Sequence, residues 1–176
     1  MNSDIFTIVA IPGTWKRVLD ILFWFRQHNN FTKIFIDKQA TTFNFTNKEI
    51  KKLYPGVSTI AVIFNPWERM VNNYLHHLSK GSKITFDGFI SEFYNLEISK
   101  NAAKCQLDFI DGVDYLLRDS NFREDFKTLQ YYLNDYRDIS LTDNKIDYKK
   151  LYNSNTINFV NELYKRDIEY FKFNLP

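Results

Sequence analysis

The chain of 176 residues is long enough for one domain with a hydrophobic core, and its formal net charge of +2 gives no general basis for nucleic-acid binding. Aromatic residues make up 18% of the sequence, so aromatic packing is expected to carry much of the core. The single cysteine, Cys105, excludes a disulfide framework and a cysteine-rich metal site, and it fits a reducing compartment. No signal-peptide pattern is present and the most apolar stretch, 18–25, is too short to span a bilayer, so we expect one cytoplasmic domain over 1–176, without metal or membrane association.

The first predicted element is a buried strand over residues 5–11 (IFTIVAI), a β-rich apolar run that ends at a Pro-Gly pair. A helix follows over residues 15–25, where apolar residues recur at helical spacing, and Thr14 is the expected N-cap. Further along the chain, the sequence predicts a short strand over 33–37 and a short helix over 48–54, which a second Pro-Gly pair stops.

The turn between the first strand and its helix reads Ile-Pro-Gly-Thr-Trp-Lys-Arg and is built on Gly13. Lys16 and Arg17 stand in the first turn of the helix, where cations oppose the helix dipole by ~0.3–1 kcal/mol each. An anion bound to the free N–H groups of that turn would reverse the sign of this effect. Two interpretations stay open: a cradle for a phosphate or sulfate, and a pair of solvated surface cations.

Residues 57–64 and the helix after them form the best-specified segment. The strand is β-branched and almost wholly apolar, as expected of a central parallel strand. Asn65 suits the N-cap and Pro66 the first helical position, and a core-facing stripe then runs to Leu78. Polar residues occupy the opposite side of the helix, namely Arg69, Asn72, Asn73 and His76. Two interpretations stay open: these side chains bind a phosphate ester, or they form a solvated helix face on which Arg69 pairs with a carboxylate.

The remaining predicted elements are helices over 85–94, 122–133 and 156–171 and a strand over 113–117. This strand can alternatively form a hairpin with residues 107–110, because an Asp-Gly pair between them suits a tight turn. Strand–helix alternation along the chain predicts an α/β protein, a three-layer α/β/α domain with a mainly parallel central sheet.

Several segments of the chain resemble segments of the sulfotransferases and occur in the same order as in that family. The sulfuryl donor of these enzymes is 3′-phosphoadenosine-5′-phosphosulfate (PAPS). Residues 64–74 (FNPWERMVNNY) are similar to the family's motif for the 3′-phosphate of PAPS, and residues 12–14 are similar to its loop for the 5′-phosphosulfate. Residues 106–130 resemble the family's downstream strand and helix, and residues 148–173 resemble the closing helix of carbohydrate-type and bacterial members. The resemblance covers most of the chain and implies the P-loop-NTPase-like sulfotransferase fold.

The resemblance also implies a donor site formed by both strand–helix junctions. In the first junction Gly13 and Thr14 match the phosphosulfate loop, and in the second Asn65 and Arg69 match the 3′-phosphate motif. PAPS would be the donor substrate, and no metal is implied. The predicted donor-binding residues are Gly13, Thr14, Trp15, Lys16, Arg17, Asn65, Arg69 and Asn72.

The sequence departs from the family in both junctions. Phe64 stands where the family has arginine, Asn72 stands where it has serine, and the first loop is shorter and lacks the family's lysine. Lys16 and Arg17 are the candidates to replace that lysine. Exchange of arginine for phenylalanine removes a charge-assisted contact of about 1.5–3 kcal/mol.

An active enzyme would transfer the sulfuryl group in line to an acceptor hydroxyl, and the type of C-terminal segment favours a saccharide. Lys16 would stabilise the developing charge, and His76 is the candidate base because imidazole titrates near neutrality. An Asp or Glu carboxylate stays an alternative base. His76 and His77 can instead be a surface histidine pair. Two other functions stay open: a fold that has lost PAPS binding and serves as a glycan- or protein-binding module, and an enzyme that uses another anionic donor in the same cradle.

Overall fold

The computed structural model describes residues 6–27, 46–141 and 147–176. Within this part of the chain lies a three-stranded, all-parallel sheet in the order β1-β2-β3. Its strands are β1 (Phe6–Val9), β2 (Ser58–Ile63) and β3 (Tyr115–Arg118). The prediction of an α/β protein with a parallel sheet is therefore confirmed. The predicted strand at 33–37 lies outside the described residues.

Strand β2 is the central strand, as its apolar sequence predicts. In the parallel register Val9 lies opposite Ala61, and Ile63 lies opposite Arg118. The alternative hairpin is wrong: residues 107–110 form the short helix α6 (Leu107–Ile110), and β3 pairs with β2 in parallel. A tight turn cannot join parallel strands, and the chain instead passes through several helices between β2 and β3.

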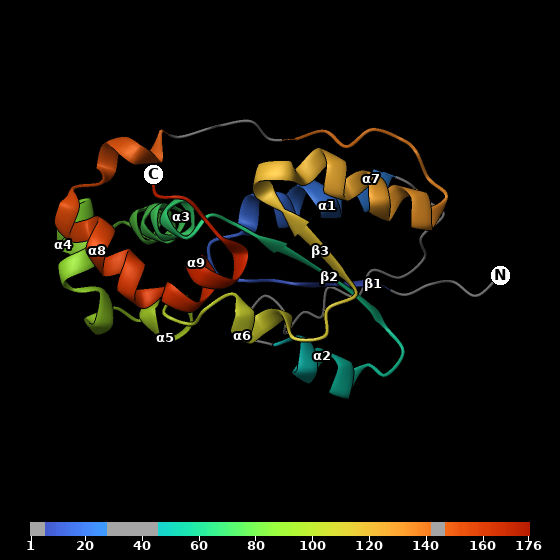
Figure 1. Ribbon diagram of the computed structural model, residues 1–176, viewed down its shortest axis with the longest axis horizontal. Coiled ribbons are helices and arrows are strands. Elements are labelled where there is room, and N and C mark those ends of the chain that lie inside the picture. The colour runs from blue at the N-terminus through green and yellow to red at the C-terminus, as the bar shows by residue number, and fades with distance from the viewer. Residues whose placement is uncertain (1–5, 28–45, 142–146) are drawn as a thin grey trace.

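Helices cover both faces of the sheet (Figure 1). One face packs against α1 (Trp15–Gln27) and α7 (Phe122–Leu133), and the other packs against α6 and α2 (Asn47–Leu53). Side chains of β2 and the residue after it alternate between these faces: Ile60, Val62 and Phe64 face α1 and α7, whereas Ala61 and Ile63 face α2 and α6. Burial on both faces explains why the whole strand is apolar.

A separate group of helices packs beyond the carboxyl end of β2. It consists of α3 (Pro66–Ser79), α4 (Phe86–Ser91), α5 (Ser99–Ala102), α8 (Ser154–Leu163) and α9 (Lys165–Phe171), with short 3-10 turns at Phe93–Asn95 and Tyr148–Leu151. In Figure 1, α3, α4 and α8 lie together at the end of the molecule away from the N-terminus. Their shared core includes Trp67, Met70, Phe89, Phe93, Val160 and Tyr164. Of the helices that the structure describes, none is both long and apolar enough to cross a membrane.

The predicted N-cap of α3, Asn65, is confirmed. The Asn65 side chain accepts a hydrogen bond from the Trp67 N–H at the start of α3, and Thr85 accepts one from the Gly88 N–H at the start of α4. The prediction of one continuous helix over 156–171 is wrong, because the chain forms two helices there, α8 and α9, which are separated at Tyr164. Tyr164 leaves helical geometry there, and its buried hydroxyl donates to the Ala102 carbonyl.

Candidate functional site

The two strand–helix junctions singled out by the sequence lie against each other at Gly13. A Cβ at this position would lie 2.8 Å from Arg69 Cγ, 2.8 Å from Arg69 O and 3.2 Å from Asn73 Nδ2, and the backbone φ is +87°. The Asn72 side chain adds a hydrogen bond from Nδ2 to Gly13 O of 3.0 Å. Both the left-handed backbone and the close approach to α3 require glycine here. The loop after β1 is therefore packed directly on the first half of α3.

Arg69 links this loop to the rest of the fold from a fully buried position. Its Nε donates to Pro12 O at 2.8 Å, and its Nη2 donates to Lys104 O at 2.9 Å. The guanidinium also lies 4.7 Å from the centre of the Tyr164 ring, a cation–π contact. The side of α3 that the sequence marks as polar is thus enclosed at Arg69, where protein groups bind the guanidinium.

Asp167 supplies the counter-charge to Arg69, with 3.8 Å between Oδ2 and Nη1. Its two oxygens also accept from the Gln106 N–H at 2.7 Å and the Leu107 N–H at 3.1 Å. Burial raises the pKa of Asp167, while the hydrogen bonds and Arg69 act in the opposite direction. The Gln106 side chain in turn holds the backbone of Phe64, accepting from its N–H and donating to its carbonyl at 2.9 Å each. A continuous buried polar network therefore joins the ends of β1 and β2 to α9.

Arg17 is also buried and is held by carboxylates on two elements. Its Nε donates to Asp119 Oδ1 at 2.6 Å and its Nη1 donates to Asp20 Oδ2 at 2.9 Å. Its guanidinium also lies 5.3 Å from the centre of the Phe122 ring. Burial disfavours the charged form of Arg17, but the two carboxylates outweigh this effect and raise its pKa. The interpretation of Arg17 as a solvated cation is therefore wrong, and its charge is already balanced within the protein.

Four predicted residues remain partly exposed: Trp15 and Lys16 at the start of α1, and Asn72 and His76 on α3. We call these four residues the rim. The Trp15 and His76 rings lie 5.8 Å apart and bridge the two helices. Burial, together with Lys80 and His77, lowers the pKa of His76, so its imidazole is mostly neutral at pH 7.

The other predicted residues have local structural contacts. The hydroxyl of Thr14 is buried and donates to Ile11 O at 2.8 Å, and Asn65 caps α3. Asn73 differs from them, because its Nδ2 has no hydrogen-bond partner within the described residues although the residue is only 2% exposed. A buried donor of this kind is costly unless an oxygen atom accepts from it.

An open cleft of about 480 Å³ lies beside the first turn of α1, at the carboxyl end of β3. Ligands of open parallel α/β sheets commonly bind at this edge. Arg17 belongs both to the cleft wall and to the first turn of α1. The cleft is lined by Arg17, Asp119, Ser120, Asn121, Phe122, Arg123, Glu124 and Leu141. In the part of the chain that the structure describes, no group of three or more His, Cys, Asp or Glu residues is placed to hold a metal ion.

Comparisons with protein-family models, with curated proteins and with solved structures found no match. The sulfotransferase resemblance consequently rests on the motif segments of the sequence alone. The residues present fit the two ends of PAPS unequally. The start of α1, with the partly exposed Lys16 in its first turn, suits a 5′-phosphosulfate. The matched 3′-phosphate positions do not fit, since Phe64 lies in the core and Arg69 is enclosed.

Sequence reasoning missed the partners of both arginines. Asp119 lies far along the chain from Arg17, and Asp167 lies far from Arg69, and no local pattern marks either carboxylate; only Asp20, at i+3 from Arg17, is a local partner. For Arg17 a signal was available, because it shares a helical face with the buried residues Ile21 and Trp24, at i+4 and i+7. An arginine on the apolar face of a helix predicts a buried ion pair more readily than a ligand contact.

Proposed function

We propose that this protein is a sulfotransferase-like enzyme that transfers a sulfuryl group from PAPS to an acceptor hydroxyl, with a saccharide as the expected acceptor class. The observation that carries this proposal is the contact of Gly13 with Arg69 and Asn73. It joins the two segments of the resemblance at the carboxyl edge of a parallel sheet, beside a helix N-terminus, where phosphorylated ligands are commonly held. On this proposal the fold is that of the sulfotransferases, and the cytoplasm is the expected compartment.

The rim supplies the groups that such a reaction needs. When bound, PAPS provides an activated sulfuryl group, whose bond to the phosphate oxygen breaks as a bond to the acceptor oxygen forms. The start of α1 and Lys16 would stabilise the negative charge, and neutral His76 would take the acceptor's proton. The cleft of about 480 Å³ that Arg17 lines at the first turn of α1 is within the size range of small-molecule sites and offers polar groups to an acceptor.

The test combines binding with turnover. We expect calorimetry to show binding of adenosine 3′,5′-bisphosphate, the stable product of the donor, and an acceptor screen to show sulfate transfer from PAPS. Lys16→Ala should weaken binding, while His76→Gln should leave binding intact and abolish transfer. Lys52→Ala, an exposed lysine on α2, is the matched control and should change neither. Absence of binding and of transfer in a folded wild-type sample would refute the proposal.

A second candidate function is a glycan- or protein-binding module that has lost the donor. The specific observation in its favour is the state of three residues at the two strand–helix junctions. Arg17 pairs with two carboxylates, Arg69 is enclosed, and Phe64 is part of the core. This candidate predicts no binding of the donor product at millimolar concentration, together with thermal stabilisation by glycans in an array-guided screen. Donor-product binding that depends on Lys16 would rule it out.

A further inference from the structure

We infer that this protein recognises the 5′-phosphate end of a nucleotide donor and does not recognise a 3′-phosphate, so that adenosine 5′-phosphosulfate would serve as well as PAPS. This inference rests on the proposed function and specifies the chemical class of its donor. Four observations carry it: the loop after β1, the core position of Phe64, the enclosure of Arg69, and the neutral side chains Asn65 and Asn72 at the other matched positions.

The first junction keeps the features of an anion cradle. Gly13 permits the left-handed turn of the loop after β1, and the 13-residue helix α1 begins two residues later, at Trp15. Lys16 stands partly exposed in the first turn of that helix. Independently, the buried Asn73 Nδ2 lies against Gly13 without a hydrogen-bond partner, as expected of a donor that waits for an oxygen-bearing ligand.

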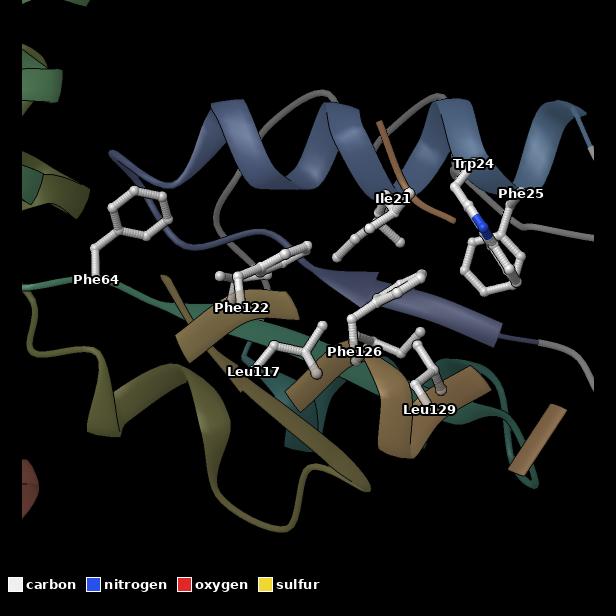
Figure 2. Close-up of a cluster of buried hydrophobic side chains, with 11 residues drawn as sticks. Ile21, Trp24, Phe25, Phe64, Leu117, Phe122, Phe126 and Leu129 are labelled. Atoms are coloured by element: carbon white, nitrogen blue, oxygen red, sulfur yellow. The ribbon is translucent and has the colours of Figure 1, made fainter. Parts of the chain in front are cut away.

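At the second junction, the position where the resemblance would place a cation is occupied by a core residue. Phe64 is 1% exposed and belongs to the cluster between the sheet, α1 and α7. Figure 2 shows its ring on the same side of the sheet as Ile21 and Phe122. The paired hydrogen bonds with Gln106 hold the backbone of Phe64, so its Cα–Cβ bond keeps pointing toward the core.

The remaining cation of the matched motif, Arg69, is not available to a phosphate. Contact with one would require the guanidinium to leave the carbonyls of Pro12 and Lys104. The departure would also leave Asp167 buried without its counter-charge, a costly arrangement. A phosphate that entered instead would lie close to the Asp167 carboxylate in a water-poor site, where like charges repel strongly.

The other matched positions are neutral and already have structural roles. Asn65 caps α3 through the Trp67 N–H, and Asn72 donates to Gly13 O. Among the four matched positions Phe64, Asn65, Arg69 and Asn72, none therefore presents an exposed positive charge. A 3′-phosphate at this junction would give up its hydration without gaining a charged partner from the motif.

The test is a calorimetric titration of the full chain with three probes: adenosine 5′-phosphate, adenosine 3′-phosphate and adenosine 3′,5′-bisphosphate. We expect the 5′-phosphate and the bisphosphate to bind within about threefold of each other, and the 3′-phosphate to bind at least about tenfold more weakly, because one charge-assisted contact corresponds to about tenfold or more. Lys16→Ala should weaken both 5′-phosphorylated probes equally, and Lys52→Ala should weaken neither.

Three results would overturn the inference. A bisphosphate affinity at least about tenfold above that of the 5′-phosphate would show that a 3′-phosphate is recognised, while leaving the proposed function intact. Equal binding of the 3′-phosphate and the 5′-phosphate would show that the 5′ end is not distinguished. Failure of all three probes to bind a folded sample would overturn both the inference and the proposed function.

Discussion

Arg69 and Asp167 form an ion pair in which neither side chain has any solvent exposure, with 3.8 Å between Nη1 and Oδ2. The pair connects α3 to α9, two helices almost one hundred residues apart in the chain. Because Arg69 also donates to Pro12 O, the contact extends from the C-terminal helix to the loop after β1. The geometry of the candidate site therefore depends on how α9 packs.

Replacement of Asp167 by asparagine is expected to destabilise the protein by about 3–5 kcal/mol, because it leaves the buried Arg69 guanidinium without its counter-charge. Denaturant-induced unfolding, followed by circular dichroism, gives the free energy of unfolding. The control is Asp147→Asn, which breaks an exposed pair with Lys150 and should cost no more than about 1 kcal/mol. Equal losses in the two variants would mean that the buried pair does not stabilise the fold.

Gly13 and Gly56 have similar backbone angles, so substitutions at the two positions distinguish the stability cost of backbone strain from the cost of a packing collision. Gly13 has φ +87° and Gly56 has φ +83°, but a Cβ at Gly56 would meet nothing within 4 Å. We expect Gly56→Ala to cost about 1–2 kcal/mol from the left-handed backbone alone. Gly13→Ala should cost about 1–3 kcal/mol more, because the methyl group would collide with Arg69. Urea unfolding of both variants measures the difference, and equal costs would contradict the close packing of the loop on α3.

Introduction of the family's arginine at position 64 tests whether the donor site can be restored. Phe64→Arg would bury a charge among apolar side chains, so we expect a loss of more than about 4 kcal/mol and no gain in affinity for adenosine 3′,5′-bisphosphate. The size control is Phe64→Leu, with an expected loss of about 1–2 kcal/mol. Thermal unfolding and calorimetry measure the two effects. A stable Phe64→Arg variant with tighter bisphosphate binding would show that the arginine can reach the ligand.

The fold could be predicted where the signals are local. The segment from 57 to 78 combines an apolar strand, an Asn65 cap and Pro66, and the structure reproduces each of these features. The four-residue helices α5 and α6 were not predicted, since one turn of helix contains too few residues for a periodic pattern. The break at Tyr164 was also missed, because the apolar spacing continues through it.

The candidate site was predictable only in part. The resemblance implied one site formed by both strand–helix junctions, and Gly13 of the first junction does lie against α3. It did not show which cations remain available for a ligand, because this depends on distant partners: Asp119 is 102 residues from Arg17, and Asp167 is almost one hundred residues from Arg69. Ion pairs across such separations follow from tertiary packing, which a single sequence does not display.

The state of His76 gives a prediction for pH. Its folded-state pKa lies below the ordinary value of 6.5, so the unfolded chain binds the proton more readily. His76 therefore contributes stability at pH values above its pKa in the unfolded chain. That contribution is lost as the pH falls through its pKa in the folded protein. Between about pH 7 and pH 5, wild type should lose more stability than His76→Gln. An NMR titration of the imidazole measures the pKa directly, and a value at or above 6.5 would contradict the burial of the ring beside Trp15.

The most direct test of the nucleotide site is a two-dimensional amide NMR titration with adenosine 5′-phosphate. If the loop after β1 is the cradle, the largest shifts should fall on the backbone N–H groups of Gly13, Trp15 and Lys16, and Lys16→Ala should reduce them. The amides of α2, on the other face of the sheet, should stay unchanged. Shifts absent from the loop up to millimolar ligand, or confined to another part of the protein, would contradict the proposed site.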